Sequence, residues 1–243
     1  MHLAKDKLIV ALDVDSAERA FELFDKLRDV VGMFKIGLQL FTAAGPDIVR
    51  RIVSRGGRVF LDLKFHDIPN TVAAAGVEAT RLGVTIFNVH ASGGAEMMQH
   101  TAEIVNATAE REDLAKPKVI AVTLLTSLDT NNVQNIGFVE EPRSLVRKLA
   151  RLAADSGLDG VVASPQEIRL VRQEVTNPSF LIVTPGIRAV SSTADDQRRV
   201  MTAGEAIADG ANHIVVGRPI LNASDPVQAA LLIVEQIGKS LPK

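Results

Sequence analysis

The sequence predicts an α/β protein folded as a single (β/α)8 TIM barrel that spans residues 1–243. The first observation is that eight short apolar or β-branched segments alternate with eight helical patterns, with no linker between them. The second is that the predicted strands are apolar along their length, which is typical of parallel strands buried on both faces. The third is the length of the chain, which suits one barrel. A doubly wound sheet is the weaker alternative.

The eight predicted strands are runs of four to seven residues rich in Val, Ile, Leu and Phe. Each ends where a polar residue, a glycine or a proline interrupts the run, as Asp13 does for the first strand and Gly37 for the second. In chain order the predicted strands are 8–12, 33–36, 58–64, 86–90, 119–123, 160–163, 180–184 and 213–216.

The predicted helices follow the strands and carry their own start and stop signals. Asp15 followed by Glu18 resembles a capping box, and Pro165 and Pro226 each come directly after a polar capping residue. Gly56 ends the second helix. The helices are expected to start at 15, to cover 46–55, 71–82, 94–111 and 143–156, to start again at 165, to cover 202–209, and to start last at 226.

The composition is that of an ordinary globular protein, with 47% hydrophobic residues, 23% charged residues and a formal charge of −2. Without a basic block there is no electrostatic footprint for nucleic acid. The chain has no cysteine, which excludes disulfides, thiolate metal sites and cysteine nucleophiles. It also has no Trp and no Tyr, so those side chains contribute to no ligand site.

The N-terminal residues 1–7 run into the first strand without the apolar core and cleavage site of a signal peptide. No apolar stretch approaches the roughly 18 residues that a membrane span needs. We therefore expect a cytoplasmic protein with no membrane partner.

Polar and charged residues follow most of the predicted strands. Function in such barrels gathers at the carboxyl ends of the strands, so these residues are expected to share one face. Single polar residues at these positions are often helix caps, but charges of alternating sign from three neighbouring strands indicate a functional site. In chain order the strand ends carry Asp13, Lys35, Asp62 with Lys64, His90, Thr123, Ser164, Pro185-Gly186 and Gly217-Arg218.

The third strand carries the pattern Asp-x-Lys-x-x-Asp at Asp62, Lys64 and Asp67. Residues two apart in a strand share a face, so Asp62 and Lys64 are expected to point the same way, roughly 7 Å apart along the chain. For this pattern alone, a structural ion pair is the simpler interpretation. Together with Asp13 and Lys35 it favours a catalytic site.

Lys64 allows two chemistries at a strand end. A Schiff base, as in an aldolase, needs a neutral amine. Flanking carboxylates favour the ammonium form, and with Asp62 and Asp67 beside it and Asp13 near, we expect Lys64 to act as a charged group. Its ammonium would also be electrostatically unfavourable in a metal cluster of Asp62, His66 and His90, so no metal site is expected.

The opposite side of the barrel mouth resembles a phosphate site. Barrels often bind phosphate with the loops after strands seven and eight. Gly217 permits close backbone approach and Arg218 offers a bidentate donor, while Arg188 and Gln197 stand in the preceding loop. The polar segment 187–197 is expected to act as a lid. His213 lies at the other end of its strand and is expected to be structural.

Along its whole length the chain resembles the bacterial-type orotidine 5′-phosphate decarboxylases. The core Asp-x-Lys-x-x-Asp pattern also occurs in related barrel decarboxylases that act on a keto-sugar phosphate and use Mg²⁺. The segment 68–71, Ile-Pro-Asn-Thr, and Lys35 in place of an acidic metal ligand favour the orotidylate enzymes. The resemblance also rests on Asp13, Lys35-Ile36-Gly37, the segment 88–94 (Asn-Val-His-Ala-Ser-Gly-Gly), Thr126-Ser127, the segment 184–188 (Thr-Pro-Gly-Ile-Arg), the segment 196–199 (Asp-Gln-Arg-Arg) and Gly217-Arg218-Pro219.

The resemblance implies a homodimer with active sites shared at its interface, and cofactor-free decarboxylation of orotidine 5′-monophosphate to UMP and CO₂. Lys64 would protonate C6 of the pyrimidine, and Asp62 would lie against the substrate carboxylate. Asp13 and Lys35 would contact the ribose hydroxyls, and Thr126, with Ser127 as a second candidate, would contact the pyrimidine. The phosphate would be held by Arg188, Gln197, Gly217 and Arg218. The partner subunit would contribute Asp67, Ile68 and Thr71.

Three other functions stay open at this point. The Mg²⁺-dependent keto-sugar-phosphate decarboxylase is the first, a Schiff-base aldolase is the second, and a non-catalytic barrel that binds a phosphorylated ligand is the third.

Overall fold

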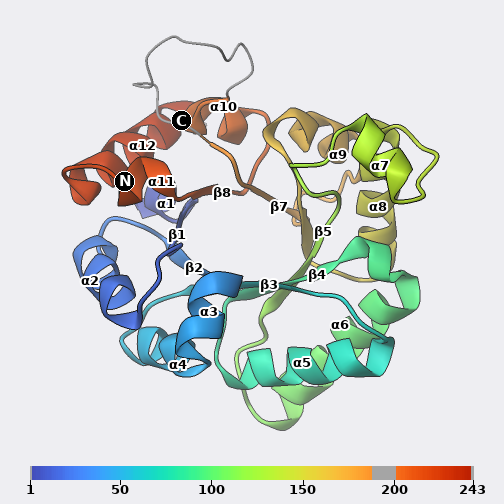
Figure 1. The fold of residues 1–243 in the computed structure, drawn as a ribbon, viewed down its shortest axis with the longest axis horizontal. Helices are drawn as coiled ribbons and strands as arrows, with labels where there is room; N and C mark the ends of the chain where they lie inside the picture. The colour runs from blue at the N-terminus through green and yellow to red at the C-terminus, as the bar shows by residue number, and fades with distance from the viewer. Residues whose placement is uncertain (1, 188–200, 242–243) are drawn as a thin grey trace.

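The computed structural model describes residues 2–187 and 201–241, and it forms the predicted closed barrel (Figure 1). Every strand is parallel to the next one in the chain, and β8 pairs with β1 to close the ring. The strands are β1 Leu8–Ala11, β2 Met33–Gly37, β3 Val59–Phe65, β4 Ile86–His90, β5 Lys118–Val122, β6 Gly160–Val162, β7 Leu181–Thr184 and β8 His213–Val216.

Helices surround the barrel. Seven helices lie where the sequence predicts them: α2 Ala17–Leu27, α4 Asp47–Ser54, α5 Pro69–Arg81, α6 Ala95–Arg111, α8 Pro142–Asp155, α10 Ala203–Ala208 and α12 Pro226–Ser240. The helix expected from 165 is a 3₁₀ turn, η2 Pro165–Glu167, followed by α9 Ile168–Glu174. Short helices that the sequence analysis did not predict are α1 His2–Lys5, α3 Leu38–Ala44, η1 Ala91–Gly93, α7 Thr130–Asn135 and α11 Arg218–Leu221.

Two predictions about the N-terminal part were wrong. The chain does not run straight into β1, because α1 comes first and packs against α12. The cap of α2 is Ser16 rather than Asp15: the Ser16 hydroxyl accepts a hydrogen bond from the Arg19 backbone N–H at 3.4 Å. Glu18 is therefore a first-turn carboxylate near the positive end of the helix dipole, and not part of a capping box.

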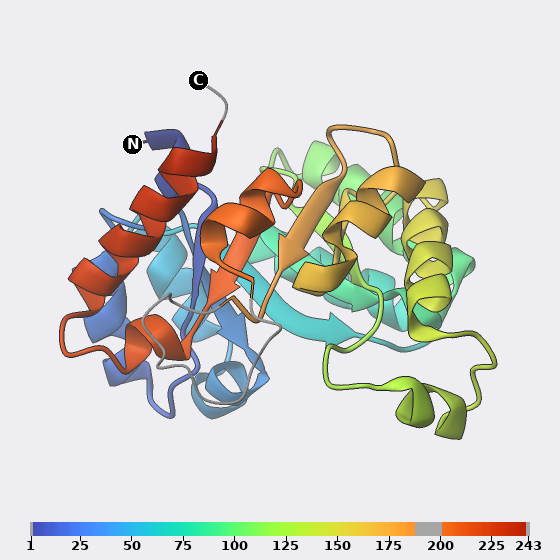
Figure 2. The same ribbon diagram turned by 90° about the horizontal axis from the view of Figure 1, so that it is seen from above.

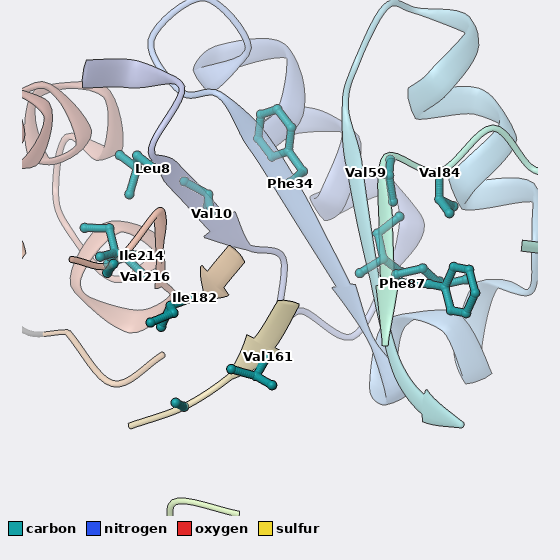
Figure 3. Packing of buried hydrophobic residues seen from close by; sticks show 14 of the residues in the cluster. Leu8, Val10, Phe34, Val59, Val84, Phe87, Val161, Ile182, Ile214 and Val216 are labelled. Carbon is teal, nitrogen blue, oxygen red and sulfur yellow. The ribbon is translucent and has the colours of Figure 1, made fainter. Parts of the chain in front are cut away.

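The core has two layers because side chains alternate between the two faces of each strand. The larger layer lies between the sheet and the helices, and Figure 3 shows part of it, with Val10, Phe34 and Phe87 among the labelled residues. The smaller layer fills the barrel itself, as in other barrels of this kind. Its buried members are Ile9, Ala11, Met33, Phe60, Ile86, Ile120, Val183 and Val215.

The carboxyl ends of all strands lie on one side of the barrel, since the strands are parallel. Figure 2 shows α7, in yellow-green, projecting from that side. In the described part of the chain, no helix has the length and apolar character needed to cross a bilayer.

Candidate active site

The barrel interior changes from apolar to polar as β1–β4 approach their carboxyl ends. Two residues after the inward-facing Ala11, Met33, Phe60 and Ile86 come Asp13, Lys35, Asp62 and Asn88. On or just after the other four strands, the residues that face the cavity at the mouth are apolar, with Val122, Val162, Pro185 and Val215. The mouth of the barrel therefore has a charged half and an apolar half.

Four of the predicted site residues form one chain of ion pairs. Lys35 Nζ lies 2.9 Å from Asp13 Oδ1 and 3.3 Å from Asp62 Oδ2. Lys64 Nζ lies 2.7 Å from Asp62 Oδ1. The two inner members are the least accessible, since the side chains of Lys35 and Asp62 are 11% and 13% exposed. Charges so poorly solvated interact more strongly than surface pairs do, and removing one partner would leave the other buried charge without compensation.

Lys64 reaches Asp62 by a route that the sequence analysis did not predict. Its backbone is left-handed, with φ of 54°, a conformation that costs a residue other than glycine about 1–2 kcal/mol. Leu61 pairs with Phe87, and Phe65 pairs with Val89. From one pair to the next, β3 therefore advances by four residues while β4 advances by two. Lys64 lies in this bulge. The side chains of Asp62 and Lys64 point the same way, as expected, although the strand between them is irregular.

Asn88, on β4 opposite the bulge, is part of the site, although the sequence analysis names it only within the segment 88–94 and assigns it no role. Its Oδ1 accepts a hydrogen bond from the Lys64 backbone N–H at 2.8 Å, and its Nδ2 donates to Asp62 Oδ1 at 2.7 Å. The side chain is almost wholly buried. A signal was available, because Asn88 is an inward-facing polar residue between the apolar Phe87 and Val89.

Gly37 makes room for the Lys35 ammonium. A Cβ atom at this position would lie 2.9 Å from Lys35 Nζ and 3.5 Å from Asp13 Oδ1. β2 thus ends at Gly37, a residue without a side chain, and the Lys35 ammonium occupies the space that a side chain would fill.

A cavity of about 220 Å³ lies against Lys64 and between the charged and apolar halves of the mouth. Its walls are Lys35, Phe60, Asp62, Lys64, Val122, Leu124, Leu125, Thr126, Val162, Pro185 and Val215. Thr126 also lines a neighbouring cavity of about 400 Å³, which extends outward to Arg143 and Gln166. The inner cavity therefore offers one edge of ammonium and carboxylate groups, the hydroxyl-bearing Thr126 and otherwise apolar walls, the usual composition of a small-molecule site.

Asp67, Ile68 and Thr71 do not join this cluster. All three are exposed at the start of α5, and Ile68 is 66% exposed. The Asp67 carboxylate accepts a hydrogen bond from the Ile68 backbone N–H at 2.6 Å. Among the described residues, Lys64 pairs with Asp62 alone, so the expectation that Asp67 flanks Lys64 within one chain was wrong.

The predicted phosphate residues are described only in part. Gly217 follows β8 beside β1, where a Cβ atom would lie 3.6 Å from Asp13 Oδ2, and the exposed Arg218 begins α11. Arg188, Gln197 and the lid expected over 187–197, apart from the buried Ile187, lie outside the described residues.

The histidines occupy two different settings. The rings of His66 and His90 lie 5.3 Å apart at the charged side of the mouth. Burial, and then the charges of His66 and Lys64, lower the pKa of His90. Burial also lowers the pKa of His213 to about 4, and this ring lies at the far end of the barrel. Within residues 2–187 and 201–241, no three histidine, aspartate or glutamate side chains are grouped to hold a metal ion.

Comparison with known proteins gives one consistent result. A family model described as "Orotidine 5'-phosphate decarboxylase / HUMPS family" matches residues 6–233. The orotidine 5′-phosphate decarboxylase of Moorella thermoacetica is 53% identical over 98% of this chain and 94% of its own length. That of Syntrophotalea carbinolica is 51% identical over 98% and 97%. The crystal structure of the Lactobacillus acidophilus enzyme has a TM-score of 0.84 and 37% identity, covering 94% of this chain and 97% of the other.

Proposed function

The chain belongs to the orotidine 5′-phosphate decarboxylase / HUMPS family, and on that basis we propose how its site releases CO₂ from orotidine 5′-monophosphate. It is a carboxy-lyase of pyrimidine biosynthesis whose product is UMP. The observation that carries the proposed mechanism is the ion-pair chain Asp13–Lys35–Asp62–Lys64, which ends at an ammonium facing a mostly apolar cavity.

The substrate would cross the mouth from its charged edge to β8. The pyrimidine would enter the inner cavity with C6 toward Lys64, and Thr126 would contact the ring. The ribose hydroxyls would lie at Asp13 and Lys35. The phosphate would lie at Gly217 and Arg218, which are near Asp13 and therefore near the ribose. Arg188 and Gln197 are proposed to bind the phosphate from the lid.

Lys64 would stabilise the transition state and then protonate the product. When the C6–carboxylate bond breaks, its electron pair stays in an sp² orbital on C6 that the ring π system cannot delocalise. The charge must be stabilised through space, and a fixed ammonium in a water-poor cavity does this. The proton then passes from Lys64 Nζ to C6, and the neutral amine recovers a proton from solvent.

Asp62 would act on the substrate rather than on the product. Its carboxylate lies against the position proposed for the substrate carboxylate, an electrostatic stress that is relieved as neutral CO₂ leaves. Contacts at the remote phosphate supply the binding free energy that offsets this stress. The apolar walls at Val122 and Val162 suit a departing CO₂ molecule better than a carboxylate.

We also propose a homodimer in which Asp67, Ile68 and Thr71 complete the partner's site. Their exposure at the charged side of the mouth supports this, and Ile68 is a large apolar side chain that a partner would cover. We further propose that the protein is located in the cytoplasm.

The direct test follows the absorbance of orotidine 5′-monophosphate with purified protein, with and without EDTA. UMP formation that is insensitive to EDTA is expected. Loss of activity with EDTA would favour the Mg²⁺-dependent decarboxylase, and trapping of substrate on Lys64 by borohydride would favour the aldolase. Nucleotide binding without any UMP, even at high protein concentration, would leave a non-catalytic barrel.

A further inference from the structure

We propose that Asn88 is the positioning residue of the site, holding both the backbone of Lys64 and the carboxylate of Asp62 in their reactive arrangement. The inference rests on the proposed decarboxylation and adds a residue to it. Asn88 would not touch the substrate itself, since it is 1% exposed and is not among the residues that line the inner cavity.

The bulge in β3 creates the need for such a residue. Where β3 advances by four residues and β4 by only two, the regular hydrogen bonds between the two strands are interrupted. A buried backbone N–H without an acceptor is unfavourable. The Lys64 N–H finds its acceptor in the Asn88 side chain at 2.8 Å, in place of a carbonyl group of β4. The left-handed conformation of Lys64 is thereby fixed by a side chain of the neighbouring strand.

The same amide fixes the orientation of Asp62. Asn88 Nδ2 donates to Asp62 Oδ1, the oxygen that also accepts from Lys64 Nζ, each at 2.7 Å. The other oxygen, Oδ2, lies 3.3 Å from Lys35 Nζ. With one oxygen held by Asn88, the carboxylate cannot rotate out of line with either ammonium.

A side-chain amide meets both requirements at neutral pH with two separate atoms. It presents one acceptor and one donor at the same time, whereas an ionised carboxylate only accepts and an aliphatic side chain does neither. The backbone of Asn88 is itself held in the sheet, because Asn88 pairs with Ile120 of β5. The support for Lys64 thus comes from the rigid sheet and not from a loop.

The first experiment compares Asn88→Leu with the unaltered protein. Leu has nearly the shape of Asn but neither hydrogen-bonding group. The kcat for orotidine 5′-monophosphate is expected to fall about 100-fold, while KM and the dissociation constant of UMP change by less than about threefold. An unchanged kcat, or a KM that rises as much as kcat falls, would overturn the inference. Thr80→Val is the matched control, because it removes a buried hydrogen bond to Gly76 O at the far end of α5.

The second experiment uses Asn88→Asp and keeps the test decisive if the Leu variant is unstable. The introduced carboxyl group can still accept from the Lys64 N–H, but it can donate to Asp62 only when the two carboxyl groups share a proton. The ratio of variant to unaltered kcat should therefore rise by about tenfold as the pH falls from about 8 to about 5.5. The charged and titratable groups around this position are Asp62, Lys35, Lys64, His66 and His90, and the unaltered protein measured over the same pH range is the reference for them.

A ratio that stays near one at every pH would show that Asn88 only fills space. The outcome is separable from the proposed function, since the unaltered protein reports whether UMP is made at all. The variants report only how the rate depends on Asn88.

Discussion

The Lys64 ammonium lies 2.7 Å from Asp62 Oδ1 although the strand that carries both residues bulges out of regular pairing with β4. The left-handed backbone at Lys64 brings the ammonium back over the carboxylate. Asp62 is at the same time shared with Lys35, so it stays paired when one of the two cations is lost. Because Asp62 keeps one cation, removing Lys64 should affect catalysis strongly and nucleotide binding little.

Lys64→Ala should abolish most of the catalysis while nucleotide still binds. Loss of a general acid that also stabilises a developing charge should lower kcat by about 10³-fold or more. UMP affinity should be retained, because Lys35 still neutralises Asp62. Steady-state kinetics and calorimetry measure the two effects. Lys148→Ala, at an exposed lysine paired with Glu140, is the control, and turnover by Lys64→Ala close to that of this control would contradict the proton-donor role.

Gly37→Ala should damage the site without unfolding the protein. The new methyl group would press on the flexible end of Lys35, which can move, so the free energy of unfolding should change by less than about 1 kcal/mol. Displacing that ammonium from Asp13 and Asp62 should lower kcat/KM by about tenfold or more. Activity equal to that of the unaltered protein would show that the close approach is unimportant.

Gly57→Ala provides the opposite result as a control. Its Cβ atom would lie 2.5 Å from the Phe24 ring and 2.9 Å from the Ile52 carbonyl oxygen, within the packed core and away from the mouth. Thermal unfolding should therefore show a loss of stability, while the kinetic constants of the protein that remains folded stay unchanged.

The barrel was predictable because its signals are local and repeated. Each strand is an apolar run of the right length, and the pairs Ser164-Pro165 and Asp225-Pro226 mark helix starts that the structure confirms. The short helices α1 and α3 left no such signal. Only Ala4 in the former and Leu40 in the latter are found among the buried apolar side chains, too few for a visible stripe. Their positions depend on packing against α12 and β2 instead.

The site was predictable where it depends on strand ends and not where it depends on strand pairing. Alternation along β1, β2 and β3 is enough to place Asp13, Lys35 and Asp62 at one face of the mouth. The bulge at Lys64 arises from the register between β3 and β4, which no single segment encodes. The hydrogen bonds of Asn88 join residues that are 24 and 26 positions apart, so they depend on that register too.

Arg218→Ala should weaken binding only for phosphorylated ligands. A charge-assisted hydrogen bond contributes about 1.5–3 kcal/mol, so UMP affinity should fall by roughly tenfold to hundredfold while uridine affinity is unchanged. Calorimetric titration with both ligands measures this difference. Arg143→Ala, at the neighbouring outer cavity, is the control and should leave UMP binding unaltered. An equal loss for uridine and UMP would remove Arg218 from the phosphate site.

A mixture of Asp62→Ala and Asp67→Ala proteins tests the shared site. Each variant alone should be nearly inactive. If the two residues serve one site from different subunits, a mixed dimer has one site with both residues intact and one site with neither. Random reassociation should then restore about a quarter of the unaltered activity. Activity equal to the sum of the separate variants would place both residues in the same subunit's site.

His213 should make the fold less stable in mild acid. Its Nδ1 lies 3.1 Å from the Asp6 carbonyl oxygen, and burial lowers its pKa in the folded protein to about 4 from the ordinary 6.5. Below about pH 6.5 the unfolded chain therefore takes up a proton that the folded chain refuses. The contribution of His213 to stability is fully present above that pH and is lost as the pH falls to about 4, by up to about 3 kcal/mol.

His213→Asn isolates this effect, because an amide can keep the hydrogen bond to Asp6 but does not titrate. Urea unfolding at pH 7, 6, 5 and 4.5 should show a shallower fall in the free energy of unfolding for this variant than for the unaltered protein. His90 adds a smaller dependence of the same sign, since its pKa is lowered too. His100→Asn, at a half-exposed position on α6, is the matched control and should keep the full slope. Parallel curves for His213→Asn and the unaltered protein would show that the buried ring does not govern acid stability.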